Sequence, residues 1–154
     1  MSSLSWADAP PAPAVITVCS DSGRHCATSD LLAHKTRLID RASGAVLWSL
    51  DQAPRYFFVS NDGRTIVVLS DFANGAPLDA SPSYELFALY RNGSLLRSVR
   101  IADHFSSPSE LHATGSDLLW GYFERVDSRN NAVFSLVNGT TAAYNLGSGA
   151  RVAR

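Results

Sequence analysis

Positive charge is scarce in this sequence. Its 154 residues hold 13 Lys and Arg against 14 Asp and Glu, a net charge of −1, and Lys35 is the only lysine. Because no basic field is present to attract phosphate backbones or anionic lipid, nucleic-acid binding is not expected. No run of about 18 apolar residues occurs, so the sequence predicts no membrane span.

Signatures of catalysis and of cofactor binding are also missing. We find no G-x-G-x-x-G, P-loop, H-E-x-x-H or EF-hand pattern, and no G-x-S-x-G elbow. His104, Glu110 and His112 could be combined with nearby serines into a triad or a metal site. Their spacing is nondescript and no oxyanion-hole glycines accompany them. We therefore predict a protein that is not an enzyme and that holds no cofactor or metal.

The first residues resemble the remnant of an export signal. Small residues at Ser5 and Ala7 precede the Pro/Ala-rich stretch from Asp8, as around a signal-peptidase cut, although the apolar core of a signal is missing. We interpret residues 1–13 as a signal-peptide stub, with an ordinary disordered leader as the alternative. This predicts a periplasmic protein whose signal has been removed or trimmed.

The two cysteines also indicate an exported protein. Cys19 and Cys26 flank "SDSGRH", and a turn centred on Ser22 and Gly23 would place them opposite each other on paired strands. Directly opposed residues lie within disulfide range, and disulfides persist in oxidising compartments. We predict a hairpin disulfide; two reduced thiols are the alternative.

Strand signals dominate the rest of the chain. Short runs rich in Val, Ile, Leu, Tyr and Phe alternate with Gly, Asn, Asp and Ser, and "YFFVSNDGRTIVVLSD" (56–71) reads as one hairpin. A single turn of helix is suggested by the Ser-x-x-Glu pattern in "SSPSELHATG". Six hairpins can be aligned in two alternating series, whose turns lie at Ser22-Gly23, Asp62-Gly63 and Gly115-Ser116 and at Ser43-Gly44, Asn92-Gly93 and Asn138-Gly139.

Two consecutive hairpins make a four-stranded unit of about 45 residues, the size of a propeller blade. The sequence thus predicts an all-β fold, a propeller-like array of three four-stranded antiparallel sheets with about 12 strands. One domain would cover 14–154, in units of about 14–51, 55–102 and 108–154. Closed propellers need about four to eight blades, so we expect a distorted, propeller-like barrel; a two-chain, six-bladed ring or loops that plug the gap are the alternatives.

Two long connections, 72–84 and 102–112, are the candidate binding loops. Both are polar and contain proline, which lowers the entropy lost on binding. Loops held on a rigid β scaffold are the usual place for binding, although plain surface connections are the alternative.

Together, the signal stub, the hairpin disulfide, the blade-like repeats, the stiff Ser-rich loops and the lack of catalytic motifs resemble a known family. The chain is similar to periplasmic immunity proteins that bacteria use against type VI-secreted peptidoglycan amidases, as in Pseudomonas-type effector–immunity pairs. The resemblance implies that the chain binds a Cys/His peptidoglycan amidase toxin and occludes its active site by inserting a loop.

On this sequence the inserting loop would be "HFSSPSE", with Ser106 and Ser107 at its tip, and 72–84 is the competing loop. A serine hydroxyl can donate to and accept from a catalytic thiolate or imidazole without being cleaved. Aromatic anchors would add binding energy. The predicted partner-binding residues are His104, Phe105, Ser106, Ser107, Pro108, Ser109, Glu110, Phe72, Asn74 and Tyr84.

Two other functions remain open at this point. A carbohydrate- or peptide-binding propeller-like module could use Trp48, Trp120 and Tyr122 as exposed aromatics, although these do not recur at equivalent positions in the three units. A half-propeller that dimerises is the other alternative.

Overall fold

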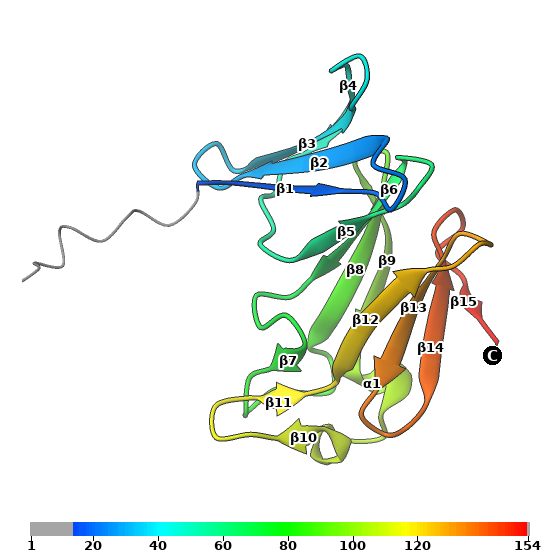
Figure 1. Cartoon of the computed structure of the whole chain (residues 1–154). Helices are drawn as coiled ribbons and strands as arrows, with labels where there is room; N and C mark the ends of the chain where they lie inside the picture. Colours follow the sequence, from blue (N-terminus) through cyan, green and yellow to red (C-terminus); the bar gives the residue numbers. More distant parts are fainter. Residues whose placement is uncertain (1–13, 154) are drawn as a thin grey trace, which may run out of the picture.

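The structure is a computed structural model that describes residues 14–153, and it consists largely of antiparallel sheets (Figure 1). The strands form three four-stranded sheets and one small three-stranded sheet. This confirms the predicted all-β, propeller-like array. The predicted signal-peptide stub at 1–13 lies outside the described residues.

The first two sheets each use two consecutive hairpins, as the repeat predicted. In the first sheet the strands follow chain order, with β1 (Val15–Cys19), β2 (His25–Asp30), β3 (Lys35–Asp40) and β4 (Val46–Leu50). The second sheet contains β5 (Phe57–Val59), β6 (Thr65–Leu69), β8 (Glu85–Arg91) and β9 (Ser94–Arg100).

The third sheet differs from the predicted unit 108–154. It contains β12 (Gly121–Val126), β13 (Asn131–Leu136), β14 (Thr141–Asn145) and β15 (Arg151–Val152). The hairpin around Gly115 does form, from β10 (His112–Ala113) and β11 (Leu118–Leu119), but β11 pairs with β7 (Gly75–Ala76) in the small separate sheet. The local pattern identified this hairpin correctly and assigned it to the wrong sheet, because its partner strand lies in a distant loop.

Two short helical turns lie between β9 and β10, namely α1 (Ile101–His104) and the 3-10 turn η2 (Pro108–Glu110). The Ser-x-x-Glu prediction is confirmed at η2. Ser107 caps the turn and the Glu110 side chain returns to the cap backbone.

The second sheet is buried on both faces. Along β6, Ile66 packs with Leu38 of the first sheet, whereas Val67 packs in the cluster that contains Phe134 of the third. Ile66 and Val67 are 0% and 1% exposed, since successive side chains of a strand point to opposite faces. The run of apolar residues in β6 is what a strand covered on both sides requires.

Aromatic side chains fill the space between the second and third sheets. Phe87 stacks on Phe134 with ring centroids 4.1 Å apart, and meets the Tyr144 ring edge-on at 5.6 Å. Trp120 lies 5.7 Å from Phe87 and is fully buried. Such pairs add about 0.5–1.5 kcal/mol each beyond the area that they bury.

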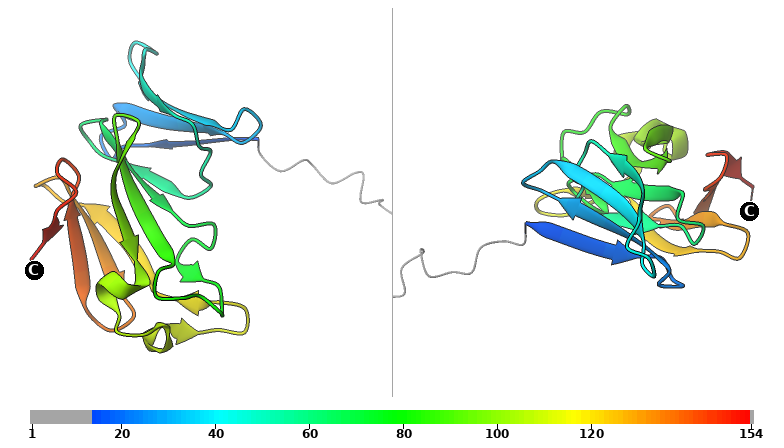
Figure 2. Two further views of the ribbon diagram at one scale, coloured as in Figure 1. Left: turned by 180° about the vertical axis from the view of Figure 1, so that it is seen from behind. Right: turned by 90° about the horizontal axis from the view of Figure 1, so that it is seen from above.

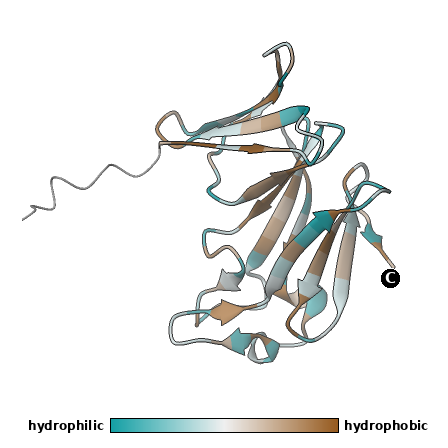
Figure 3. Cartoon of the chain, viewed as in Figure 1, coloured by the Kyte–Doolittle hydropathy of each residue, from teal (hydrophilic) through white to brown (hydrophobic). Residues whose placement is uncertain are grey.

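The two outer sheets each pack one face against the second sheet. Figure 2 shows the first and third sheets on either side of the second, and the described residues form no further blade to close a ring. Apolar residues run along β5 and β13 in the interior of the array (Figure 3). Residues 14–153 therefore form an open arrangement of three blade-like sheets.

The predicted disulfide is confirmed. Cys19 and Cys26 are directly opposed on β1 and β2 and are bonded to each other. In the chain-entropy description, a loop this short contributes about 2–3 kcal/mol to stability.

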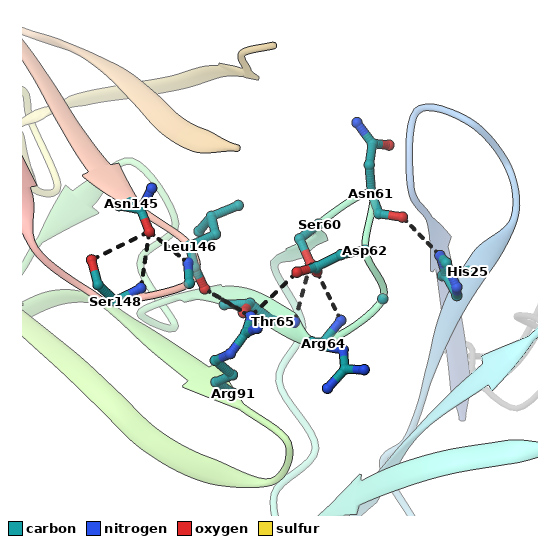
Figure 4. Close-up of polar contacts among 12 residues, drawn as sticks. His25, Ser60, Asn61, Asp62, Arg64, Thr65, Arg91, Asn145, Leu146 and Ser148 are labelled. Carbon is teal, nitrogen blue, oxygen red and sulfur yellow. Dashed lines mark hydrogen bonds and ion pairs between the residues drawn. The ribbon is translucent and has the colours of Figure 1, made fainter. Parts of the chain in front are cut away.

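Contacts through the tight turns join the first sheet to the second. The His25 ring hydrogen-bonds through Nδ1 to the carbonyl oxygen of Asn61, 2.9 Å away, as Figure 4 shows. Trp48 donates its indole N–H to the carbonyl oxygen of Gly63, also at 2.9 Å. Both acceptors belong to the β5–β6 turn, so two side chains of the first sheet hold this turn.

A second set of contacts joins the second sheet to the third. Thr65 donates its hydroxyl to the carbonyl oxygen of Leu146 at 2.6 Å, and Arg91 donates to the same oxygen at 3.2 Å (Figure 4). Arg91 also forms an ion pair with Asp62. Hydrogen bonds between sheets thus reinforce the apolar contacts at this end of the molecule.

A substitution at Gly63 tests the contact between the His25 ring and the β5–β6 turn. Its φ is +68° and a Cβ built on it would lie 2.4 Å from the His25 ring, whereas Gly44, with φ +72°, has open space around it. Alanine in this backbone region costs about 1–2 kcal/mol at either site. We expect Gly63→Ala to lose about 1–3 kcal/mol more than Gly44→Ala, from the clash alone. Urea unfolding measures both, and equal losses would show that His25 moves away without cost.

Candidate functional site

The predicted partner-binding residues fall in two groups at one end of the sheets. Figure 1 shows α1 and the small sheet at the lower end, far from the tight β5–β6 turn. One group spans the end of α1 and η2, from His104 to Glu110. The other group lies in the loop between β6 and β8, with Phe72 and Asn74 before β7 and Tyr84 before β8.

The serine loop, defined as residues 105–110, is held by its own hydrogen bonds. The backbone N–H groups of Ser106 and Ser107 both donate to the Glu110 carboxylate. Ser109 donates its N–H and its hydroxyl to Ser107 Oγ, at 3.3 and 3.0 Å. Ser106 is exposed and its hydroxyl takes no part in these bonds. The loop therefore has a fixed backbone and presents the Ser106 side chain to solvent.

The structure corrects the prediction that Phe105 binds a partner. Phe105 was expected to be an aromatic anchor for a partner, but it is only 4% exposed and belongs to the main hydrophobic core. Its N–H donates to the Ile101 carbonyl at 2.9 Å. Phe105 thus anchors the serine loop to the sheets, because an aromatic side chain gains more from burial in the core than from solvent exposure.

His104 is engaged inside the molecule. Its Nε2 lies 2.6 Å from the hydroxyl oxygen of Tyr144, a residue of β14 that is 0% exposed. Burial lowers the pKa of His104 to about 4, with Arg151 and Arg97 acting in the same direction and Asp103 opposing them. The imidazole is therefore neutral at pH 7 and ties α1 to the third sheet.

Two of the side chains considered for a triad or a metal site contact other groups of the protein. The His104 ring contacts Tyr144, and the Glu110 carboxylate accepts from backbone N–H groups. Among residues 14–153, no three His, Cys, Asp or Glu side chains are grouped so as to hold a metal ion. In the same part of the chain, no helix is long and apolar enough to cross a membrane.

The second group borders a groove between the first and second sheets. The groove is open to solvent and has a volume of about 640 Å³, and Phe72 and Tyr84 both line it. Phe72 is 45% exposed, whereas Tyr84 is partly buried against the core. Asn74 is exposed, and its backbone carbonyl accepts a hydrogen bond from the backbone N–H of Trp120 at 3.0 Å. The competing loop therefore contributes two aromatic rings to a concave surface.

Residues from other segments complete the groove, and sequence reasoning missed them. His34 and Gln52 come from connections of the first sheet, and Glu85 begins β8. No turn motif singles out His34, although its φ of +54° places it in a backbone region unusual for residues other than glycine. Only the packing of the two sheets brings these residues together.

The aromatic residues considered for carbohydrate binding are mostly unavailable. Trp120 is fully buried, and the Trp48 indole N–H donates a hydrogen bond to the Gly63 carbonyl. Tyr122 is 52% exposed, on the outer face of the third sheet. One exposed ring of the three does not make a stacking site for a sugar.

The His104–Tyr144 contact generates a prediction about pH. Because the folded-state pKa of His104 is about 4 and the unfolded value is about 6.5, the unfolded state takes up the proton first as the pH falls. Stability from this group is complete above pH 6.5 and declines down to about pH 4. We expect His104→Gln, whose amide can still bond the Tyr144 hydroxyl, to remove this part of the decline.

Urea midpoints of both proteins between pH 4 and pH 7 measure the effect. The two curves should approach each other as the pH falls. Parallel curves over the whole range would show that His104 titrates normally in the folded protein.

Comparisons with known proteins identify the fold alone. No family model and no curated protein matches the chain. Among solved structures, the chain is similar to the propeller of Dos1 (11% identity, TM-score 0.51, 90% of this chain and 31% of that one). It is also similar to a eukaryotic initiation factor (20% identity, TM-score 0.54, 92% of this chain and 31% of that one). The chain thus spans about a third of the length of these structures and shares their propeller architecture.

Proposed function

We propose that the chain is a non-catalytic binding module that holds a protein partner through the serine loop. The observation that carries this proposal is the fixed backbone of residues 105–110, buried at Phe105 and closed by the Glu110 carboxylate. A loop that is already ordered loses little conformational entropy when it binds. Propeller-like scaffolds commonly present such loops from a rigid set of sheets.

We further propose the class of the partner, a Cys/His peptidoglycan amidase toxin that the chain inhibits as a periplasmic immunity protein. Support comes from the family resemblance and from the disulfide, which suits an oxidising compartment. The exposed Ser106 hydroxyl can both donate and accept, as contact with a catalytic cysteine and histidine requires. A hydroxyl has no scissile carbonyl, so the toxin would be blocked without cleaving its inhibitor.

A peptide-binding module and a dimerising half-propeller are the competing proposals. The first is favoured by the groove at Phe72 and Tyr84. The second is favoured by the outer faces of the first and third sheets, which no other sheet covers within residues 14–153. The molecular mass in solution distinguishes these two proposals, since a closed six-bladed ring requires two chains.

Ser106→Arg tests the serine loop. A long charged side chain at the tip should prevent the loop from entering a cleft, while the fold stays intact because Ser106 is exposed. Loss of a hot-spot contact costs about 2 kcal/mol or more, so we expect binding to weaken by about 30-fold or more. Affinity for a purified Cys/His peptidoglycan amidase, and survival of cells that export the amidase together with the chain, are the measurements.

Ser94→Arg is the matched control, since Ser94 is also an exposed serine but begins β9, in the second sheet. It should bind and protect as well as the unchanged chain. Full protection by Ser106→Arg would rule out the serine loop, and a lack of binding by the unchanged chain would rule out this toxin class.

A further inference from the structure

The groove between the first and second sheets is negatively charged. Asp71 and Glu85 line it, and no Lys or Arg does. Within residues 14–153, neither carboxylate forms an ion pair. Glu85 accepts a hydrogen bond from the Ser98 hydroxyl, which orients the carboxylate. Arg100 lies opposite Glu85 in the β8–β9 pairing but does not line the groove. The lining itself therefore carries two carboxylates and no Lys or Arg, which favours a cationic occupant.

Two aromatic residues line the same groove as these carboxylates. Phe72 directly follows Asp71, and Tyr84 directly precedes Glu85, so each carboxylate has an aromatic neighbour in the chain and in the groove lining. A cation is attracted both by a carboxylate and by the face of an aromatic ring. The methylene stem of a Lys or Arg side chain would also cover the partly exposed Phe72 ring.

The wall of the groove is held in place by the core. Ala73, next to Phe72, has a φ of +52° and its carbonyl accepts from the Trp120 indole N–H at 3.2 Å. Its own N–H donates to the Ser70 carbonyl at 2.8 Å. Because Trp120 is fully buried, this bond fixes the loop that carries Asp71 and Phe72 before any ligand arrives.

We propose that this groove binds a lysine or arginine side chain of a polypeptide. The volume of about 640 Å³ is in the range of ligand sites and exceeds what one side chain needs, so the flanking backbone would also enter. The proposal adds a second contact to the proposed function, in which a partner protein is bound at the serine loop. It can be tested with peptides alone, so that either proposal can fail without the other.

The test uses an acetylated, amidated peptide with one arginine between glycines and the same peptide with citrulline, which keeps the shape and lacks the charge. NMR titration of the isotope-labelled chain follows the backbone amides of Asp71, Phe72 and Glu85. We expect the arginine peptide to shift these signals, with a dissociation constant on the order of 1 mM that rises with salt. The citrulline peptide should shift them little.

The variant Asp71→Asn with Glu85→Gln keeps the hydrogen-bonding shape and removes both charges. It should weaken binding by about tenfold, as expected for two solvated ion pairs. Asp79→Asn is the control, because Asp79 is an exposed carboxylate of the same loop outside the groove. Equal shifts with both peptides, unchanged binding by the double variant, or no shift at the groove would each overturn the proposal.

Discussion

The second sheet has no free face, because Ile66 packs toward the first sheet and Val67 toward the third. This double burial holds the three sheets as one array. The first and third sheets each pack one face against the second sheet, on opposite sides of it. The stability of the whole therefore depends on side chains that alternate along β6 and β8, which explains why these strands are apolar on both sides.

The two ends of the sheets have different roles. At one end, short glycine turns are joined by hydrogen bonds from His25, Trp48 and Thr65 to backbone carbonyls of the next sheet. At the other end, longer connections carry the serine loop and the wall of the acidic groove. The first end therefore joins neighbouring sheets to each other, and the second end carries the candidate binding surfaces.

The residues that could have been catalytic serve the fold instead. His104 is neutral and holds α1 to Tyr144, and Glu110 closes the serine loop. Within residues 14–153, the candidate binding surfaces present an exposed serine hydroxyl on an ordered backbone and a groove lined by two carboxylates that form no ion pair. Both features suit the recognition of a partner. The proposed role as an inhibitor of a protein partner is consistent with this chemistry.

The sequence by itself determined the hairpins, the disulfide and the capped turn at Ser107, since each depends on residues that are close in the chain. It also indicated the number of blade-like sheets through the spacing of the turns. Only the tertiary structure decided that the hairpin around Gly115 pairs with β7, that Phe105 turns inward, and that His34 and Glu85 line one groove. These features depend on contacts between distant segments, and local alternation of apolar residues does not specify which buried surface a segment will meet.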